Sequence, residues 1–309
     1  MSNLLSGRVA KDRPARRPLA RAHREALFAY LFLAPSLLFF LIFFVTPMVI
    51  EFFGSLHGGQ ALLGRGPYVG LQNYIDAMND SMFWDVLRIT VVFSMMTVGG
   101  GVVLGMTLAL ILNEPLPLRT LFRSLIYFPY LTAFVITALI FRVMLDPYQG
   151  ILNAALRHLG LPLQNWLINP SLALPLLAAV TVWHGVGNNV VIFLAGLAGI
   201  PQDLYEASDI DGATPQARVL HITLPLLAPV ILFVIIIGLV ESLEAFLQPF
   251  VMTQGGPANE TRLYAYHVYN VAFSDVRFGY ASALAFIMFA LMLLITVGIL
   301  RFSRWQAEY

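Results

Sequence analysis

Six long apolar runs, separated by shorter polar segments, make up most of the 309-residue chain. They cover residues 26–53, 86–112, 120–144, 172–198, 225–250 and 279–301. A helix needs roughly 20 apolar residues to cross the hydrocarbon core of a bilayer, and each run reaches that length. The pattern therefore predicts an all-α integral membrane protein with six transmembrane helices.

The composition agrees with a membrane protein and excludes several kinds of chemistry. Hydrophobic residues make up 59% of the chain and charged residues 11%, against about 45–50% and about 25% in soluble domains. Cysteine is absent, which excludes disulfides, thiolate nucleophiles and cysteine-bound metals. The net charge of +1 provides no basic field for nucleic acid. The six histidines are scattered along the sequence, so we predict no metal site.

The sequence also lacks the means to bind ATP in a phosphate-binding loop. Its single lysine, Lys11, follows Ala10, whereas the loop G-x-x-x-x-G-K-[ST] needs a glycine directly before the lysine. We therefore expect this chain to bind no cofactor and not to be an enzyme.

The placement of lysine and arginine predicts the orientation in the membrane. With the N-terminus inside, the inner segments hold 12 of these cations and the outer segments 6. Both termini are then cytoplasmic, and the outer loops are residues 54–82, 145–171 and 251–277. We expect residues 1–24 to form a basic cytoplasmic tail, followed by a retained first span rather than a cleaved signal peptide, and residues 25–309 to form the membrane domain.

The one long inner loop, residues 199–224, is polar yet patterned for helix, and we call it the acidic loop. Four acidic residues crowd its first half, before a Gly at position 212 that is typical of a helix C-terminus. Thr214 and Pro215 then predict an N-cap and a first-turn proline, and Pro225 and Pro229 predict a break at re-entry into the membrane. An amphipathic linker on the lipid headgroups is the alternative, but the anionic inner leaflet would repel the acids. The loop therefore favours a cationic protein partner.

Several segments resemble one family of transport proteins. EASDIDGA (206–213) and ITLPLLAP (222–229) resemble the EAA loop of permease subunits of binding-protein-dependent ABC importers, although Ser208 replaces the second alanine. The segments APSLLFF (34–40), YVGLQNY (68–74), GILNAALRHLGLP (150–162) and TQGGP (253–257) follow the carbohydrate branch of that family in the same order.

The resemblance implies a type I ABC importer permease fold and a set of partners. Partners would be a second homologous permease, a dimer of ATPase subunits that hold ATP and Mg²⁺, and an extracytoplasmic solute-binding protein that delivers a sugar or polyol. The membrane would be a bacterial-type inner membrane. The acidic loop would form a cytoplasmic coupling helix that docks on the ATPase, through Glu206, Ala207, Ser208, Asp211, Gly212 and Ala213.

Polar residues inside the spans are the candidates for a substrate pathway, because ionisable groups there are costly. His184 and Asn188 share a face of the fourth run, and Glu241, Glu244 and Gln248 follow helical spacing on the fifth. By resemblance to the maltose branch, the pathway positions are Gly185, Asn188, Gly238, Glu241, Ser242 and Ala245, to which we add Glu244. Alternatively, these groups only bond one another or the partner permease between helices.

One further expectation concerns how the helices pack. Gly101 and Gly105 form a G-x-x-x-G pattern on the second run, which predicts close helix packing.

A competing function is an ion-coupled secondary transporter that uses Glu241, Glu244 and His184 as a relay. That transporter would work without an ATPase, and it leaves the acidic loop unexplained.

Overall fold

The computed structural model describes residues 19–59 and 66–306, which are helical apart from turns and one isolated bridge between His57 and Tyr68. The structure divides into two units, one up to Glu51 and one from Phe52. Residues 1–18, most of the predicted basic tail, lie outside the described residues, and the first helix, α1, begins at Leu19.

In the first unit, α1 (Leu19–Phe40) continues through a π-helical turn, η1 (Leu41–Val45), into α2 (Thr46–Ser55), whose residues from Phe52 onward belong to the second unit. The hydroxyl of Thr46 donates to the Leu41 carbonyl at 2.9 Å, which supplies a bond at the wide turn just before Pro47. The described apolar side chains from Tyr30 onward are almost all exposed. An exposed apolar helix of this length suits a lipid-facing span.

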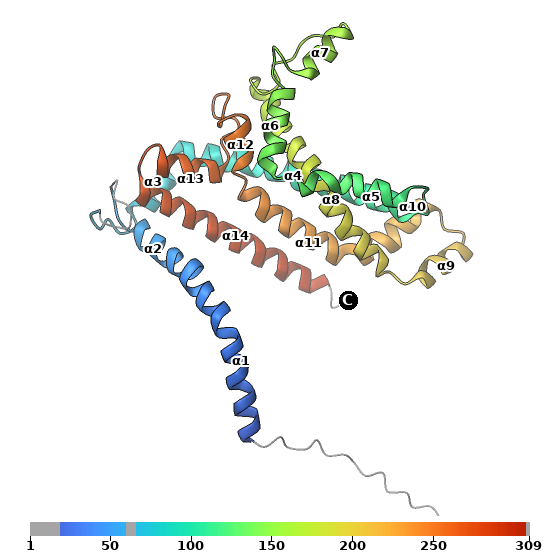
Figure 1. The fold of residues 1–309 in the computed structure, drawn as a ribbon, viewed down its shortest axis with the longest axis horizontal. Coiled ribbons are helices and arrows are strands. Elements are labelled where there is room, and N and C mark those ends of the chain that lie inside the picture. Colours follow the sequence, from blue (N-terminus) through green and yellow to red (C-terminus); the bar gives the residue numbers. More distant parts are fainter. Residues whose placement is uncertain (1–18, 60–65, 307–309) are drawn as a thin grey trace, which may run out of the picture. The chain divides into compact units, whose positions relative to one another are not determined.

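The second unit holds the remaining helices, which Figure 1 shows with their labels. They are α3 (Gln72–Asn79), α4 (Ser81–Asn113), α5 (Arg119–Tyr127), η3 (Phe128–Leu131), α6 (Phe134–Met144), α7 (Ile151–His158), α8 (Pro170–Ala198), α9 (Gln202–Ile210), α10 (Pro215–Arg218), η4 (Val219–Thr223), α11 (Leu224–Leu243), α12 (Leu247–Met252), α13 (Tyr264–Phe273) and α14 (Phe278–Gln306). Within the described residues, five helices are long and apolar enough to cross a membrane, or six if α5 and α6 count as one bent span.

The third apolar run, 120–144, is not the single straight helix that the sequence predicts. The chain bends by 93° between η3 and α6, where Thr132 and Ala133 are extended. Pro129 lies at the start of the break, and the Thr132 hydroxyl bonds the Pro129 carbonyl at 2.7 Å and the Thr137 hydroxyl at 3.1 Å. These bonds satisfy polar groups that a broken helix would otherwise leave unpaired in the membrane.

The fifth run also differs from its prediction, at both ends. The predicted break at Pro225 is wrong, because α10, η4 and α11 form one continuous helix from Pro215 to Leu243. The π-helical turn η4 ends just before Pro225 and widens the helix where the proline ring would clash with the preceding turn. The helix then ends at Leu243, so Gln248 belongs to the short helix α12 and does not continue the face of Glu241.

The prediction of close packing at Gly101 and Gly105 is confirmed, since both glycines of α4 lie against α8. A Cβ atom at Gly101 would lie 2.9 Å from Asn189 Nδ2, and one at Gly105 would lie 2.8 Å from Asn189 Cβ. A side chain at Gly105 would collide with the Asn189 Cβ, whereas one at Gly101 would meet only the end of the Asn189 side chain, so α4 and α8 pack closely around Asn189.

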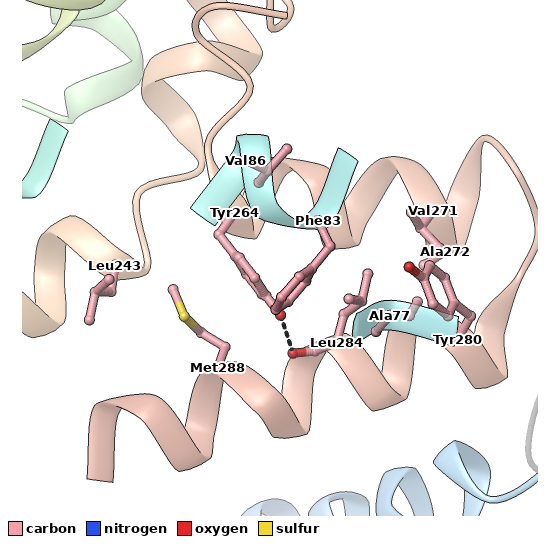
Figure 2. Close-up of a cluster of buried hydrophobic side chains, with 11 residues drawn as sticks. Ala77, Phe83, Val86, Leu243, Tyr264, Val271, Ala272, Tyr280, Leu284 and Met288 are labelled. Carbon is pink, nitrogen blue, oxygen red and sulfur yellow. Dashed lines mark hydrogen bonds between the residues drawn. The ribbon is translucent and has the colours of Figure 1, made fainter. Parts of the chain in front are cut away.

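A second buried cluster ties α3, α4, α13 and α14 together, with Leu243 at the end of α11 (Figure 2). Tyr264 lies at its centre, where its hydroxyl donates to the Leu284 carbonyl at 2.8 Å and its backbone N–H donates to the Thr90 hydroxyl at 2.9 Å. Because Leu243 belongs to the same cluster as Leu284 and Met288, the cluster holds the last turn of α11 against α14.

Candidate functional site

The seven predicted pathway residues line one cavity of about 400 Å³ in the second unit. The cavity lies among α4, η3, α6, α8, α11 and α12. The predicted residues in its wall are Gly185, Asn188, Gly238, Glu241, Ser242, Glu244 and Ala245. The tertiary structure therefore brings together residues from the fourth and fifth apolar runs that were selected separately.

Two carboxylates and three amides, those of Asn188, Asn189 and Gln248, supply free polar groups to this wall. Glu241 is exposed in the last turn of α11, and Glu244 is exposed at its C-terminal end. Within the described residues, the side chains of Glu241, Glu244, Asn188, Asn189 and Gln248 have no hydrogen bond or ion pair to the rest of the chain. Carboxylates are acceptors only and amides both donate and accept, so this wall presents a set of unpaired hydrogen-bonding groups.

The other four predicted residues shape the wall rather than supply free polar groups. Ser242 is buried, and its hydroxyl donates to the Ser94 hydroxyl on α4 at 2.8 Å. Ala245 is also buried. Gly185 leaves open space where a Cβ would stand, whereas a Cβ at Gly238 would lie 3.3 Å from the Val98 side chain.

His184 lies in the cavity wall and also bonds to a neighbouring element, which is the kind of contact between helices that the alternative interpretation expects. Its Nε2 lies 3.1 Å from the Thr132 carbonyl at the bend of the third run. The Phe134 ring packs edge-on against the imidazole, with centroids 5.1 Å apart. The imidazole therefore satisfies a carbonyl that the break of the third span leaves free.

Sequence reasoning missed the aromatic side of the cavity. Tyr130 and Phe134 flank the bend and line the cavity. The signal was present in Pro129, which interrupts the apolar run and favours a break, but a break alone does not show which side chains turn inward.

The acidic loop has the helix, glycine turn and second helix that the sequence predicts. Gly212 takes a left-handed conformation with φ +72°, and the backbone N–H of Ala213 donates to the Ser208 carbonyl at 2.9 Å. The Thr214 hydroxyl accepts from the Ala217 N–H at 3.3 Å, with Pro215 in the first turn. These are the bonds of a glycine-terminated helix followed by a capped one.

The six predicted coupling residues separate into two groups in this loop. Glu206, Ala207, Asp211 and Gly212 are exposed. Ser208 is buried, with its hydroxyl donating to the Tyr205 carbonyl at 2.7 Å, and Ala213 is partly buried beside it. The outer face of α9 also carries Ile210, whose exposed fraction of 88% is high for an apolar residue.

Two further contacts, which sequence reasoning did not find, join α9 to the helix that follows. Arg218 Nη1 forms an ion pair with Asp209 Oδ1 at 2.8 Å, and the Tyr205 hydroxyl lies 3.1 Å from the Thr223 hydroxyl. The continuous helix Pro215–Leu243 then runs for roughly 40 Å, at 1.5 Å per residue. The acidic loop and the cavity wall are therefore connected by one helix.

The described part of the chain holds no group of three or more His, Asp or Glu side chains able to bind a metal ion.

The fold and the cavity together define a polytopic helical membrane permease. Residues 101–306 match the family of binding-protein-dependent transport system inner membrane components, and the chain belongs to that family.

Curated relatives match over nearly their whole length. The chain is 35% identical to the trehalose/maltose transport system permease protein MalF of Thermococcus litoralis, covering 93% of this chain and 97% of that one. It is 32% identical to the arabinooligosaccharides transport system permease protein AraP of Bacillus subtilis, covering 89% and 88%. It is also 32% identical to the sulfoquinovosyl glycerol transport system permease protein SmoG of Agrobacterium fabrum, covering 91% of each chain.

Solved structures share the fold. A crystal structure of a bacterial ABC transporter that imports the acidic polysaccharide alginate matches with a TM-score of 0.81 at 24% identity, covering 93% of this chain and 98% of that one. The predicted all-helical permease fold is confirmed. The family is one of transport components rather than enzymes, and the comparisons give no support to an ion-coupled transporter.

Proposed function

We propose that this chain is one of two homologous permease subunits of an ATP-driven importer for a sugar or polyol. A dimer of ATPase subunits, holding ATP and Mg²⁺, would dock on the acidic loop, and an extracytoplasmic solute-binding protein would deliver the substrate. The names of the relatives, which include transport systems for trehalose/maltose and for arabinooligosaccharides, support a saccharide substrate.

The proposed orientation places both termini and the acidic loop in the cytoplasm of a bacterial-type cell, because that side then carries the excess of arginine. The α6 helix supports a second permease. Its Ile136, Ile140 and Val143 are at least half exposed although α6 begins at the cavity wall. A homologous subunit would cover this apolar face of α6.

The observation that carries the proposal is the connection between loop and cavity. Helix α9 presents Glu206 outward and is joined through Asp209 and Tyr205 to a helix whose last turn carries Glu241 and whose end is followed by Glu244. A push on α9 from a closing ATPase dimer would therefore reach the cavity wall along one continuous helix. Glu206 would form a charge-assisted bond with a cationic group or backbone donor of the ATPase.

Affinity purification of the tagged chain from mild detergent tests this proposal. We expect a second six-span permease and an ATPase to co-purify, and substrate uptake to require ATP. Glu206→Lys should lower ATPase recovery by at least ~10-fold, since loss of a paired charge at an interface costs about 2 kcal/mol or more. Glu260→Lys, an exposed charge reversal at the far loop, is the matched control. A chain that purifies alone and transports without ATP would refute the proposal.

A further inference from the structure

Among the described residues, the cavity wall carries acidic side chains without basic ones to balance them. Its described lining contains two carboxylates, Glu241 and Glu244, and no lysine or arginine. The one imidazole in the lining, His184, already uses its Nε2 on the Thr132 carbonyl. Even one ionised carboxylate would leave this wall negative, with no fixed cation to balance it.

The unpaired groups in the wall match a particular ligand chemistry. The carboxylates of Glu241 and Glu244 accept hydrogen bonds, which sugar hydroxyls can donate, while the amides of Asn188 and Gln248 donate and accept. Tyr130, Phe134 and Phe246 add ring faces, against which the apolar face of a sugar ring can pack. An anionic sugar would place a like charge beside unpaired carboxylates, which opposes binding.

We propose that this cavity accepts saccharides without acidic groups and rejects those that carry a carboxylate, sulfonate or phosphate. The inference rests on the proposed function and narrows its substrate class. The relatives leave that class open. One is named for trehalose and maltose and another for sulfoquinovosyl glycerol, and a transporter of the acidic polysaccharide alginate shares the fold. The charge of this chain's own cavity wall makes the distinction.

The absence of cysteine makes a direct test possible. Asn188→Cys places the only thiol of this chain in the cavity wall, and an uncharged maleimide reports its accessibility. The labelling rate is measured on this chain's band in the complete permease–ATPase complex in nanodiscs, without binding protein. The two probes are cellobiose, which is neutral, and cellobiouronic acid, which has the same two-ring size with one carboxylate. Ser171→Cys, at the exposed start of α8, is the matched control.

We expect cellobiose to slow labelling of Asn188→Cys at concentrations at least ~10-fold lower than cellobiouronic acid, with neither probe affecting Ser171→Cys. Adding Glu241→Gln and Glu244→Gln should remove most of that difference. If the double substitution fails to assemble with its partners, Glu244→Gln alone, at the helix end, should narrow the difference in the same direction.

The outcomes separate this inference from the function on which it rests. Equal protection by both probes, or discrimination that survives neutralisation of the carboxylates, would overturn the charge inference while leaving a sugar pathway in place. Protection by neither probe, in a complex that still imports a sugar with its binding protein, would overturn both the inference and the assignment of this cavity to the pathway.

Discussion

Gly187 on α8 is a position where the addition of a single methyl group should destabilise the packing of two helices. A Cβ atom there would overlap the carbonyl oxygen of Ile126 and lie 2.7 Å from Tyr127 Cα, so both obstacles are backbone atoms of the adjoining helix α5. Side chains can rotate away from an added methyl group, but these atoms can move only if α5 and α8 separate. We therefore expect Gly187→Ala to open the interface just beside the cavity.

The expected magnitude follows from two opposing effects. Replacing glycine by alanine within a helix stabilises it by about 1 kcal/mol through backbone entropy. Overpacking a tight interface costs about 1–3 kcal/mol, and backbone obstacles place this site at the upper end. We expect a net destabilisation of about 1–2 kcal/mol for Gly187→Ala.

Gly185 provides a matched control two residues away on the same helix. Nothing lies within 4 Å of a Cβ at Gly185, so Gly185→Ala should keep the gain in helix propensity without the clash. The assay is the thermal inactivation temperature of the purified complex, scanned at one fixed rate because unfolding of such complexes is often irreversible. An inactivation temperature for Gly187→Ala equal to or above that of Gly185→Ala would refute the reasoning.

Two further predictions concern parts of the chain outside the spans. Burial and then the charge of Arg262 lower the pKa of His267 on α13 to about 4, and neither ring nitrogen has a hydrogen-bond partner within the described residues. Because the unfolded chain takes up this proton near pH 6.5, stability should fall between about pH 6.5 and 4, by up to about 1.4 kcal/mol per pH unit. His267→Leu should flatten that part of a profile of inactivation temperature against pH, and an unchanged slope would contradict the assignment. Asn153 is buried on α7, where its amide donates to the Pro147 and Gln164 carbonyls and accepts from the Gln164 N–H and the Trp166 indole. Asn153→Leu should remove all four bonds and speed limited proteolysis within residues 146–169 by roughly tenfold or more, since each lost bond costs about 1 kcal/mol. Exposed Gln149→Leu is the control, and equal cleavage rates would count against this role for Asn153.

Local patterns in the sequence carried much of this description. Apolar runs of about 20 residues or more identify the spans, because a helix of that length matches the thickness of the hydrocarbon core of a bilayer. The Gly212 turn and the Thr214 cap were predictable because capping bonds form within a few residues of one another. The G-x-x-x-G pattern at Gly101 and Gly105 predicted a tight contact, but not that Asn189 would occupy it.

The sequence by itself therefore determined the class of protein, the apolar runs and the helix–turn–helix of the acidic loop, while the pathway residues that it selected stay a prediction. Only the tertiary structure decided that the third run bends by 93°, that the helix through Pro225 continues, and that it ends before Gln248. The bend is held in part by a contact between residues far apart in sequence, His184 to Thr132, and the π-helical turn that accommodates Pro225 is visible only in the backbone geometry. The cavity forms only when α4, α8 and α11 pack together. Its wall then combines the charges of side chains that lie far apart in sequence, which no local pattern brings together.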